Sequence, residues 1–105
     1  MSAMQKVFIC SPYRVDIHKN KQNALAYCRR AVAEGCMPYA PHLYFTRFLA
    51  ESPLEEREMG IAAGLEWLRD CSEVWVFGQS TEGMRIEIAE AERLGKKVVY
   101  NDAPG

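Results

Sequence analysis

Short apolar runs alternate along the chain with longer segments in which apolar residues recur every three or four positions. Four of the runs have the length and the dense apolar character of strands buried in a parallel sheet. Proline interrupts the second run and also closes it. The predicted strands are Val7–Cys10, Met37–Ala40, Val74–Phe77 and Lys97–Tyr100.

The segment after the first strand predicts a helix with one apolar face. We expect this helix to begin at about Asn20 or Asn23 and to end at Glu34, because Gly35 is a typical residue just beyond a helix end. The polar segment Val15–Gln22, which precedes the helix and overlaps its start, is expected to be partly mobile. The inward residues would be Ala24, Tyr27, Cys28, Ala31 and Val32.

A second helix is predicted to start with Ser52 as its N-cap, with Pro53 at the first helical position and Glu55 three residues after the cap. We expect it to run to about Asp70. Before it, the aromatic segment His42–Ala50 fits neither period and predicts a structured loop or short helical turn over the end of the sheet. The inward positions of the second helix would be Met59, Ala62, Leu65, Leu68 and Cys71.

Strands and helices therefore alternate, which is the pattern of a parallel sheet with helices packed on it. The expected fold class is α/β, with a small Rossmann/flavodoxin-like parallel sheet of four to five strands and helices on both faces. A chain of 105 residues is expected to form one domain over residues 1–105.

Composition and charge narrow the classes of partner. The net charge of −1 gives no electrostatic reason to expect binding to a nucleic-acid polymer or to a membrane surface. No apolar run approaches the length of a membrane span, so the expected compartment is the cytoplasm. The four cysteines show no metal-site spacing, so we expect free thiols and no metal.

Glu87 is the anomalous residue of the last predicted helix. Met84, Ile88, Ala91 and Leu94 form an apolar arc at helical spacing, and Glu87 falls inside that arc, between the directions of Leu94 and Ala91. A carboxylate there must either find a partner, such as Arg14 or backbone groups, or line a cavity. A carboxylate in a partly apolar cleft could serve as a nucleophile or as a general base.

Polar side chains follow each of the first three strands, where open α/β sheets form clefts. Small hydroxyls at a helix start together with an arginine could bind an anion. The alternatives are plain helix capping by Ser80 or Thr81, a solvated Arg14, and a structural role for His42. The candidates are Ser11, Tyr13, Arg14, His42, Tyr44, Ser80, Thr81 and Gly83.

Three stretches resemble the nucleoside 2-deoxyribosyltransferase-like superfamily, which includes 2′-deoxynucleoside 5′-monophosphate N-glycosidases and related domains of unknown function. The stretches are Phe8–Arg14, Gly64–Leu68 with Val74–Val76, and Glu82–Ala91. The resemblance covers essentially the whole chain.

By this resemblance, Glu87 would attack the anomeric carbon of deoxyribose and form a glycosyl-enzyme intermediate. Ser11, Arg14 and Thr81 would lie near the 5′ end of the substrate, and His42–Phe48 would cover the base. The chain departs from the family at Phe8, where a tyrosine is common, and at Gly64, where an aspartate is common.

The resulting hypothesis is an N-glycosidase or deoxyribosyltransferase-like enzyme that cleaves the N-glycosidic bond of a nucleoside or nucleoside 5′-monophosphate through Glu87. The alternative is a non-catalytic module that binds a nucleotide or a nucleotide-derived signal. No cofactor is expected, and the resemblance implies a homodimer or higher homo-oligomer. Substrate-binding roles are expected for Ser11, Tyr13, Arg14, His42, Tyr44, Ser80, Thr81 and Gly83.

Overall fold

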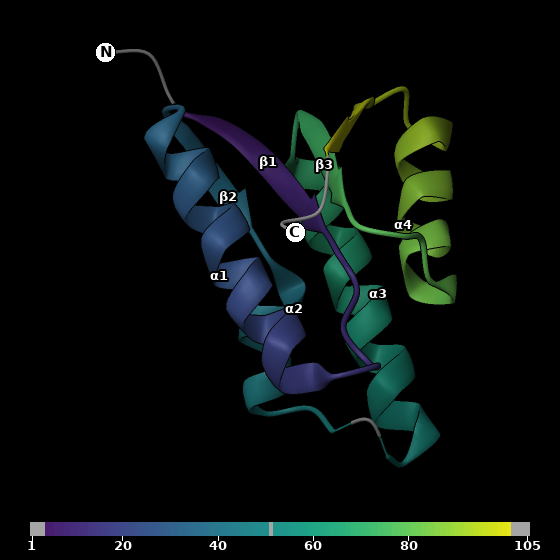
Figure 1. Ribbon diagram of the computed structural model, residues 1–105. Helices are drawn as coiled ribbons and strands as arrows, with labels where there is room; N and C mark the ends of the chain where they lie inside the picture. Colours follow the sequence, from purple (N-terminus) through teal and green to yellow (C-terminus); the bar gives the residue numbers. More distant parts are fainter. Residues whose placement is uncertain (1–3, 51, 102–105) are drawn as a thin grey trace.

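The computed structural model describes residues 4–50 and 52–101 and has four parallel strands in the order β2-β1-β3-β4 (Figure 1). Each neighbouring pair is in parallel register; for example, Phe8 pairs with Val74, and Val74 pairs with Val98. This arrangement confirms the predicted α/β fold class. The strands are β1 (Gln5–Cys10), β2 (Cys36–Tyr39), β3 (Glu73–Phe77) and β4 (Lys97–Asn101).

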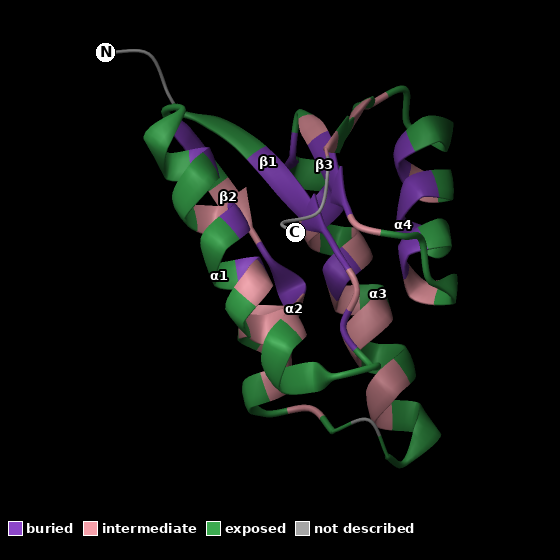
Figure 2. Cartoon of the chain, in the orientation of Figure 1, coloured by how far each residue is buried: buried purple, intermediate pink, exposed green. Residues whose placement is uncertain are grey.

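Helices cover both faces of this sheet, and two separate apolar clusters result. On one face, Tyr27 and Ala31 of the first helix pack against Val7 and Ile9 of β1. Figure 2 shows that the buried residues gather on the strands and on the helix faces turned toward them. The helical elements are α1 (Ile17–Ala33), α2 (Pro41–Tyr44), the 3₁₀ turn η1 (Phe45–Arg47), α3 (Leu54–Asp70) and α4 (Glu82–Arg93).

The opposite face is covered by α3 and α4. Leu68 of α3 and Ile88 of α4 join Phe8, Cys10 and Val76 in one buried cluster. Alternate residues of β1 therefore serve the two clusters, as the two-residue period of a strand requires. The chain leaves β1 through α1 and leaves β3 through α4, which lie on opposite faces. The carboxyl ends of β1 and β3 thus form the switch point at which open α/β sheets place their ligands.

Helix α1 begins earlier than its apolar pattern predicted. It starts at Ile17, because Asp16 acts as the N-cap and its side chain accepts a hydrogen bond from the Lys19 amide. Most of the segment expected to be partly mobile, Val15–Gln22, is therefore helical. The error arose because the first turn of α1 is largely exposed and shows no repeating apolar pattern, although it includes Ile17. The N-cap Asp16 starts the helix through its hydrogen bond, which requires no apolar spacing.

Helix α3 also departs from the prediction at its start and along its face. It begins at Leu54 with Pro53 as N-cap and has no side-chain cap hydrogen bond, so the predicted Ser52 cap is wrong. Met59 and Ala62 are exposed although an inward position was predicted for both. The buried residues of α3 are Gly64 and Leu68.

Candidate functional site

Glu87 lies in the second turn of α4, on the face of that helix that packs against the sheet. The other buried residues of this face are Met84, Ile88 and Ala91, and only 8% of Glu87 is exposed. Thr81 fixes the start of the helix, since its side chain accepts a hydrogen bond from the Met84 amide at 3.3 Å. The local sequence thus places a carboxylate at a core position close to the end of β3.

A cavity of about 590 Å³ adjoins this carboxylate. Its walls come from four segments: the connection after β1, the α2–η1 region with the residues after it, the first half of α3, and the start of α4. A volume of this size falls in the range of small-molecule sites. The lining residues are Pro12, Tyr13, Arg14, Val15, Pro41, His42, Phe45, Thr46, Leu49, Ala50, Glu56, Arg57, Gly60, Ile61, Thr81, Glu82, Gly83, Met84 and Glu87.

Burial changes the acid–base behaviour of Glu87. Loss of solvation raises the pKa of its carboxyl to about 8, and a hydrogen bond from the Cys10 side chain partly opposes that rise. At neutral pH Glu87 is therefore mostly protonated. The group can become a buried carboxylate nucleophile or base at a modestly alkaline pH.

His42 is fixed beside the cavity as a neutral ring. Its Nε2 lies 3.0 Å from the carbonyl oxygen of Ser11, and its ring stacks on Tyr13 with centroids 4.7 Å apart. Because a carbonyl only accepts, Nε2 carries the proton in this hydrogen bond. Burial lowers the pKa of His42 to about 4, although the Ser11 carbonyl opposes that shift, so the ring carries no charge at neutral pH.

The structure brings together some of the predicted site residues. Tyr13, Arg14, His42, Thr81 and Gly83 line the same cavity as Glu87. They come from the ends of β1, β2 and β3, as expected for a site at the switch point.

Three predicted residues lie elsewhere. Ser11 is buried and lines a neighbouring cavity of about 320 Å³ on the α1 side. Tyr44 is 48% exposed and stacks on Trp67, with ring centroids 5.1 Å apart. Ser80 is exposed, and its carbonyl accepts a hydrogen bond from Arg85 at 3.3 Å.

The contribution of α3 to the cavity was missed by the sequence analysis. Arg57, Gly60 and Ile61 line the cavity from this helix. A β-carbon placed on Gly64 would lie 3.6 Å from Cβ of Pro41 and 4.0 Å from Oε2 of Glu87. The spacing of Arg57, Gly60, Ile61 and Gly64 is helical and could have shown this face, but it carries few large apolar residues.

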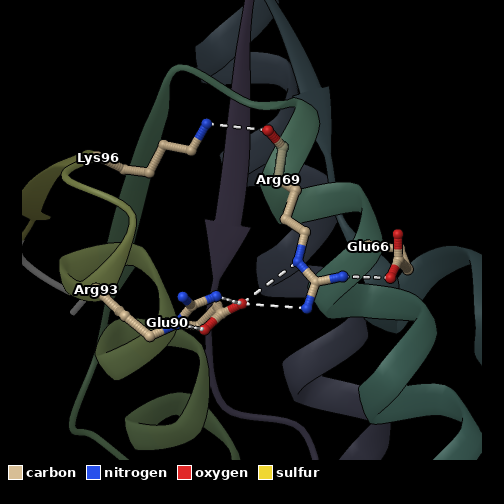
Figure 3. A network of polar contacts seen from close by, with 5 residues as sticks. All are labelled: Glu66, Arg69, Glu90, Arg93 and Lys96. Atoms are coloured by element: carbon tan, nitrogen blue, oxygen red, sulfur yellow. Dashed lines mark hydrogen bonds and ion pairs between the residues drawn. The ribbon is translucent and has the colours of Figure 1, made fainter.

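A polar network joins the C-terminal parts of α3 and α4 (Figure 3). Glu90, one turn beyond Glu87, accepts hydrogen bonds from Arg93 at 2.7 and 2.9 Å and from Arg69 at 3.3 and 3.2 Å. Arg69 also pairs with Glu66. Hydrogen bonds from Arg93 and then from Arg69 lower the pKa of Glu90 to about 2. The network ties together the two helices that form one side of the site.

Residues 4–50 and 52–101 contain neither a metal-binding cluster nor a helix that could span a membrane. Within these ranges the structure holds no group of three or more His, Cys, Asp or Glu side chains arranged to bind a metal. Within the same ranges, no helix combines the length and the apolar character needed to cross a membrane.

Comparisons with known proteins agree with the fold. Residues 5–101 match the model of a protein family described as Domain of unknown function (DUF7768). The structure superimposes on a 2-deoxyribosyltransferase from the psychrotolerant bacterium Bacillus psychrosaccharolyticus with a TM-score of 0.75 and 15% identity, covering 92% of this chain and 72% of that chain. At this identity the similarity establishes a shared fold. No curated protein matches the sequence.

Proposed function

We propose that this protein cleaves the N-glycosidic bond of a nucleoside or nucleoside 5′-monophosphate. The chain belongs to the family described as Domain of unknown function (DUF7768). Since that family has no stated activity, the proposal rests on the protein's own site. The observation that carries the proposal is Glu87, a carboxyl group buried on a helix but open to a cavity of about 590 Å³. The shared fold with a 2-deoxyribosyltransferase supports the same chemistry.

In the proposed reaction, an ionised Oε of Glu87 attacks the anomeric carbon of the sugar. The bond from this carbon to the base nitrogen breaks, and its electron pair leaves with the base, which takes up a proton. Water or a second base then displaces Glu87 from the sugar and restores the free carboxylate. The raised pKa of Glu87 implies that kcat/KM increases with pH until about pH 8, since the nucleophile must be ionised.

The polar lining supports a substrate with a 5′-hydroxyl or phosphate. Arg14 and Arg57 line the cavity, and Thr81 and Gly83 place the start of α4 at its wall. A helix N-terminus and guanidinium groups both favour an anion. His42 and Tyr13, stacked on each other, would contact the sugar or the base.

A non-catalytic nucleotide-binding module is the second candidate function. It is favoured by the residues at two positions where the chain departs from the deoxyribosyltransferase-like pattern. Phe8 is fully buried and has no hydroxyl, and Gly64 has no side chain beside the carboxylate. Neither position can therefore donate a hydrogen bond from its side chain to Glu87 or to a departing base.

The decisive experiment is chromatographic measurement of free base released from a panel of nucleosides and 5′-monophosphates. We expect the wild type to release base from at least one of them and Glu87→Ala to lose activity by a factor of about 10³ or more, as loss of a nucleophile does. Glu92→Ala is the matched control, because Glu92 is an exposed carboxylate on the same helix. It should retain wild-type activity.

The two candidate functions give opposite results in this experiment. Base release that survives in Glu87→Ala would exclude Glu87 as the nucleophile. Saturable nucleotide binding without base release, in both wild type and Glu87→Ala, would establish the binding module instead.

A further inference from the structure

We propose that Cys10 is a positioning residue for Glu87. Its thiol donates its hydrogen to the Glu87 carboxylate when Glu87 is ionised, and to the Met84 carbonyl when Glu87 is protonated. The kinetic consequence of this exchange rests on the proposed function above. The hydrogen-bond exchange itself does not.

Cys10 is placed for this role by the sheet. It is the last residue of β1, is fully buried, and belongs to the same cluster as Met84 and Ile88 of α4. Its Sγ lies 3.8 Å from the carbonyl oxygen of Met84, which is three residues before Glu87 on the same helix face. The Cys10 thiol is also within hydrogen-bonding reach of the Glu87 side chain.

A thiol has one hydrogen, so it cannot donate to both oxygens at full strength. A carboxylate is the stronger acceptor, because hydrogen bonds to ionised groups are roughly twice as strong as those between neutral groups. A protonated carboxyl competes less well, and the Met84 carbonyl then becomes the better partner. The state of Glu87 therefore decides which oxygen the thiol contacts.

Cys10 itself stays a neutral donor throughout. Burial, followed by the charge of Glu87 and the hydrogen bond to it, raises the pKa of the Cys10 thiol far above its ordinary value. Among the described residues, the other titratable groups that line the cavity of Glu87 are Tyr13 and Arg14 after β1, His42 of α2, Glu56 and Arg57 of α3, and Glu82 of α4. Cys10 differs from them because it contacts the carboxyl from the core and not across the cavity.

The Cys10 hydrogen bond therefore positions the Glu87 carboxylate from the core side and partly stabilises its ionised form. Burial favours the protonated form of Glu87, and the thiol hydrogen bond favours the ionised form. A thiol does this without placing a strongly polar group in an apolar cluster, since free cysteine packs as a small hydrophobe.

The S–H stretching band of Cys10, recorded by infrared spectroscopy, tests the exchange directly. The band is isolated as the difference between wild type and Cys10→Ala, with Cys10→Ser as a second reference if the alanine variant does not fold. We expect the band to shift to lower frequency as the pH rises through about 8, where Glu87 ionises. In Glu87→Gln the band should stay at one frequency over the whole range.

Cys71 provides the matched control, because it is a buried thiol that donates to Trp67 of its own helix at 3.4 Å. Cys71→Ala should leave the pH-dependent shift unchanged. A Cys10 band that does not move with pH in the wild type would overturn the proposal.

The kinetic test is the pH profile of kcat/KM for base release. In Cys10→Ala we expect the midpoint to rise by about one pH unit, with kcat/KM reduced up to about tenfold near neutral pH. Cys10→Ser, which keeps a donor, should restore the wild-type midpoint. A uniform loss at every pH with an unchanged midpoint would show a packing role only.

The two proposals fail in different ways. Absence of base release from every protein, with an S–H band that still titrates, would remove the glycosidase and leave the thiol donor. Base release together with an S–H band that does not move with pH would support the glycosidase and remove the thiol donor.

Discussion

At the scale of single residues, Glu87 links function to a cost in stability. A native pKa of about 8, against an ordinary value of 4.5, means that the folded protein holds a proton that the unfolded chain has lost. The free energy of unfolding therefore decreases as the pH rises from 4.5 to 8, and the full contribution is present only below that window. Ionising a group at this core position therefore costs stability.

We accordingly expect Glu87→Gln to stabilise the protein at alkaline pH. The amide fills the same space and never ionises, so the gain over wild type should be near zero at about pH 4 and on the order of 5 kcal/mol at about pH 9. Urea unfolding at the two pH values measures this difference. Glu92→Gln changes an exposed residue of the same helix, so its free energy of unfolding should differ from that of wild type by the same amount at both pH values.

Equal stability of wild type and Glu87→Gln at alkaline pH would mean that the carboxylate is solvated in the folded state. The cavity would then hydrate Glu87 well enough to cancel the cost of its burial.

Sequence analysis could find Glu87 because a charge in an apolar helical arc violates the pattern around it. It could not find Cys10 in the same way, because a thiol in an apolar run looks like any other core residue. Arg57 was missed for the opposite reason: arginine on a helix ordinarily points to solvent, and only the packing of α3 over the end of the sheet shows that it lines the cavity.

At the scale of elements, helix α3 accounts for the wrongly predicted inward residues and also offers a test of the site. The predicted inward face was wrong at Met59 and Ala62, whereas Leu65 and Leu68 of the same predicted face do pack in the core. In the first half of α3 the inward side uses small residues, which let α3 approach α2 and α4 closely. Gly64 lies next to Pro41 and Glu87, and Gly60 lies next to Leu49. The existence of the helix and its end at about Asp70 were predictable from the apolar period. The exact start and the inward residues of the first half depended on these tertiary contacts.

Gly64→Ala is expected to have a pH-dependent effect on stability. The added methyl group makes ordinary contacts with Pro41 and Glu87, and alanine is a better helix former than glycine by about 0.5–1 kcal/mol. At about pH 5 we expect that gain in full. At about pH 9 it should shrink, because the methyl group removes further water from an ionised Glu87.

Gly60→Ala is the matched control for that experiment. A β-carbon there would lie 3.7 Å from the Leu49 side chain, which is also an ordinary contact. Chemical unfolding should show the same gain at both pH values for Gly60→Ala. An identical pH response in the two variants would mean that position 64 does not influence Glu87.

At the scale of the whole molecule, the alternation of strands and helices was sufficient to predict the sheet. It also predicted that polar residues after β1, β2 and β3 would meet at one edge. The cavity was not predictable in detail, because its walls come from segments between Pro12 and Glu87 that meet only in the folded chain. Tyr44, for example, follows the correct strand but packs on Trp67, away from the cavity.

Because the walls of the cavity come from distant segments, the cavity exists only in the folded protein. A ligand that binds there should therefore stabilise the whole fold. A ligand that binds the folded state alone at about 100 times its Kd should raise the free energy of unfolding by about 2.7 kcal/mol. For a domain of this size, that corresponds to an increase in Tm on the order of 10 °C. We expect this increase from a nucleoside 5′-monophosphate with Glu87→Ala, which prevents turnover, measured by calorimetry over a series of ligand concentrations.

Ribose 5-phosphate and inorganic phosphate serve as matched ligands that lack the base. If the whole cavity is occupied, the nucleotide should stabilise Glu87→Ala at far lower concentrations than either, because the apolar walls formed by Pro41, Phe45 and Ile61 would contact the base. Equal shifts from phosphate and nucleotide would limit recognition to Arg14, Arg57 and the start of α4. No shift from any nucleotide would remove nucleosides and nucleotides from the ligands of this cavity, and with them both candidate functions.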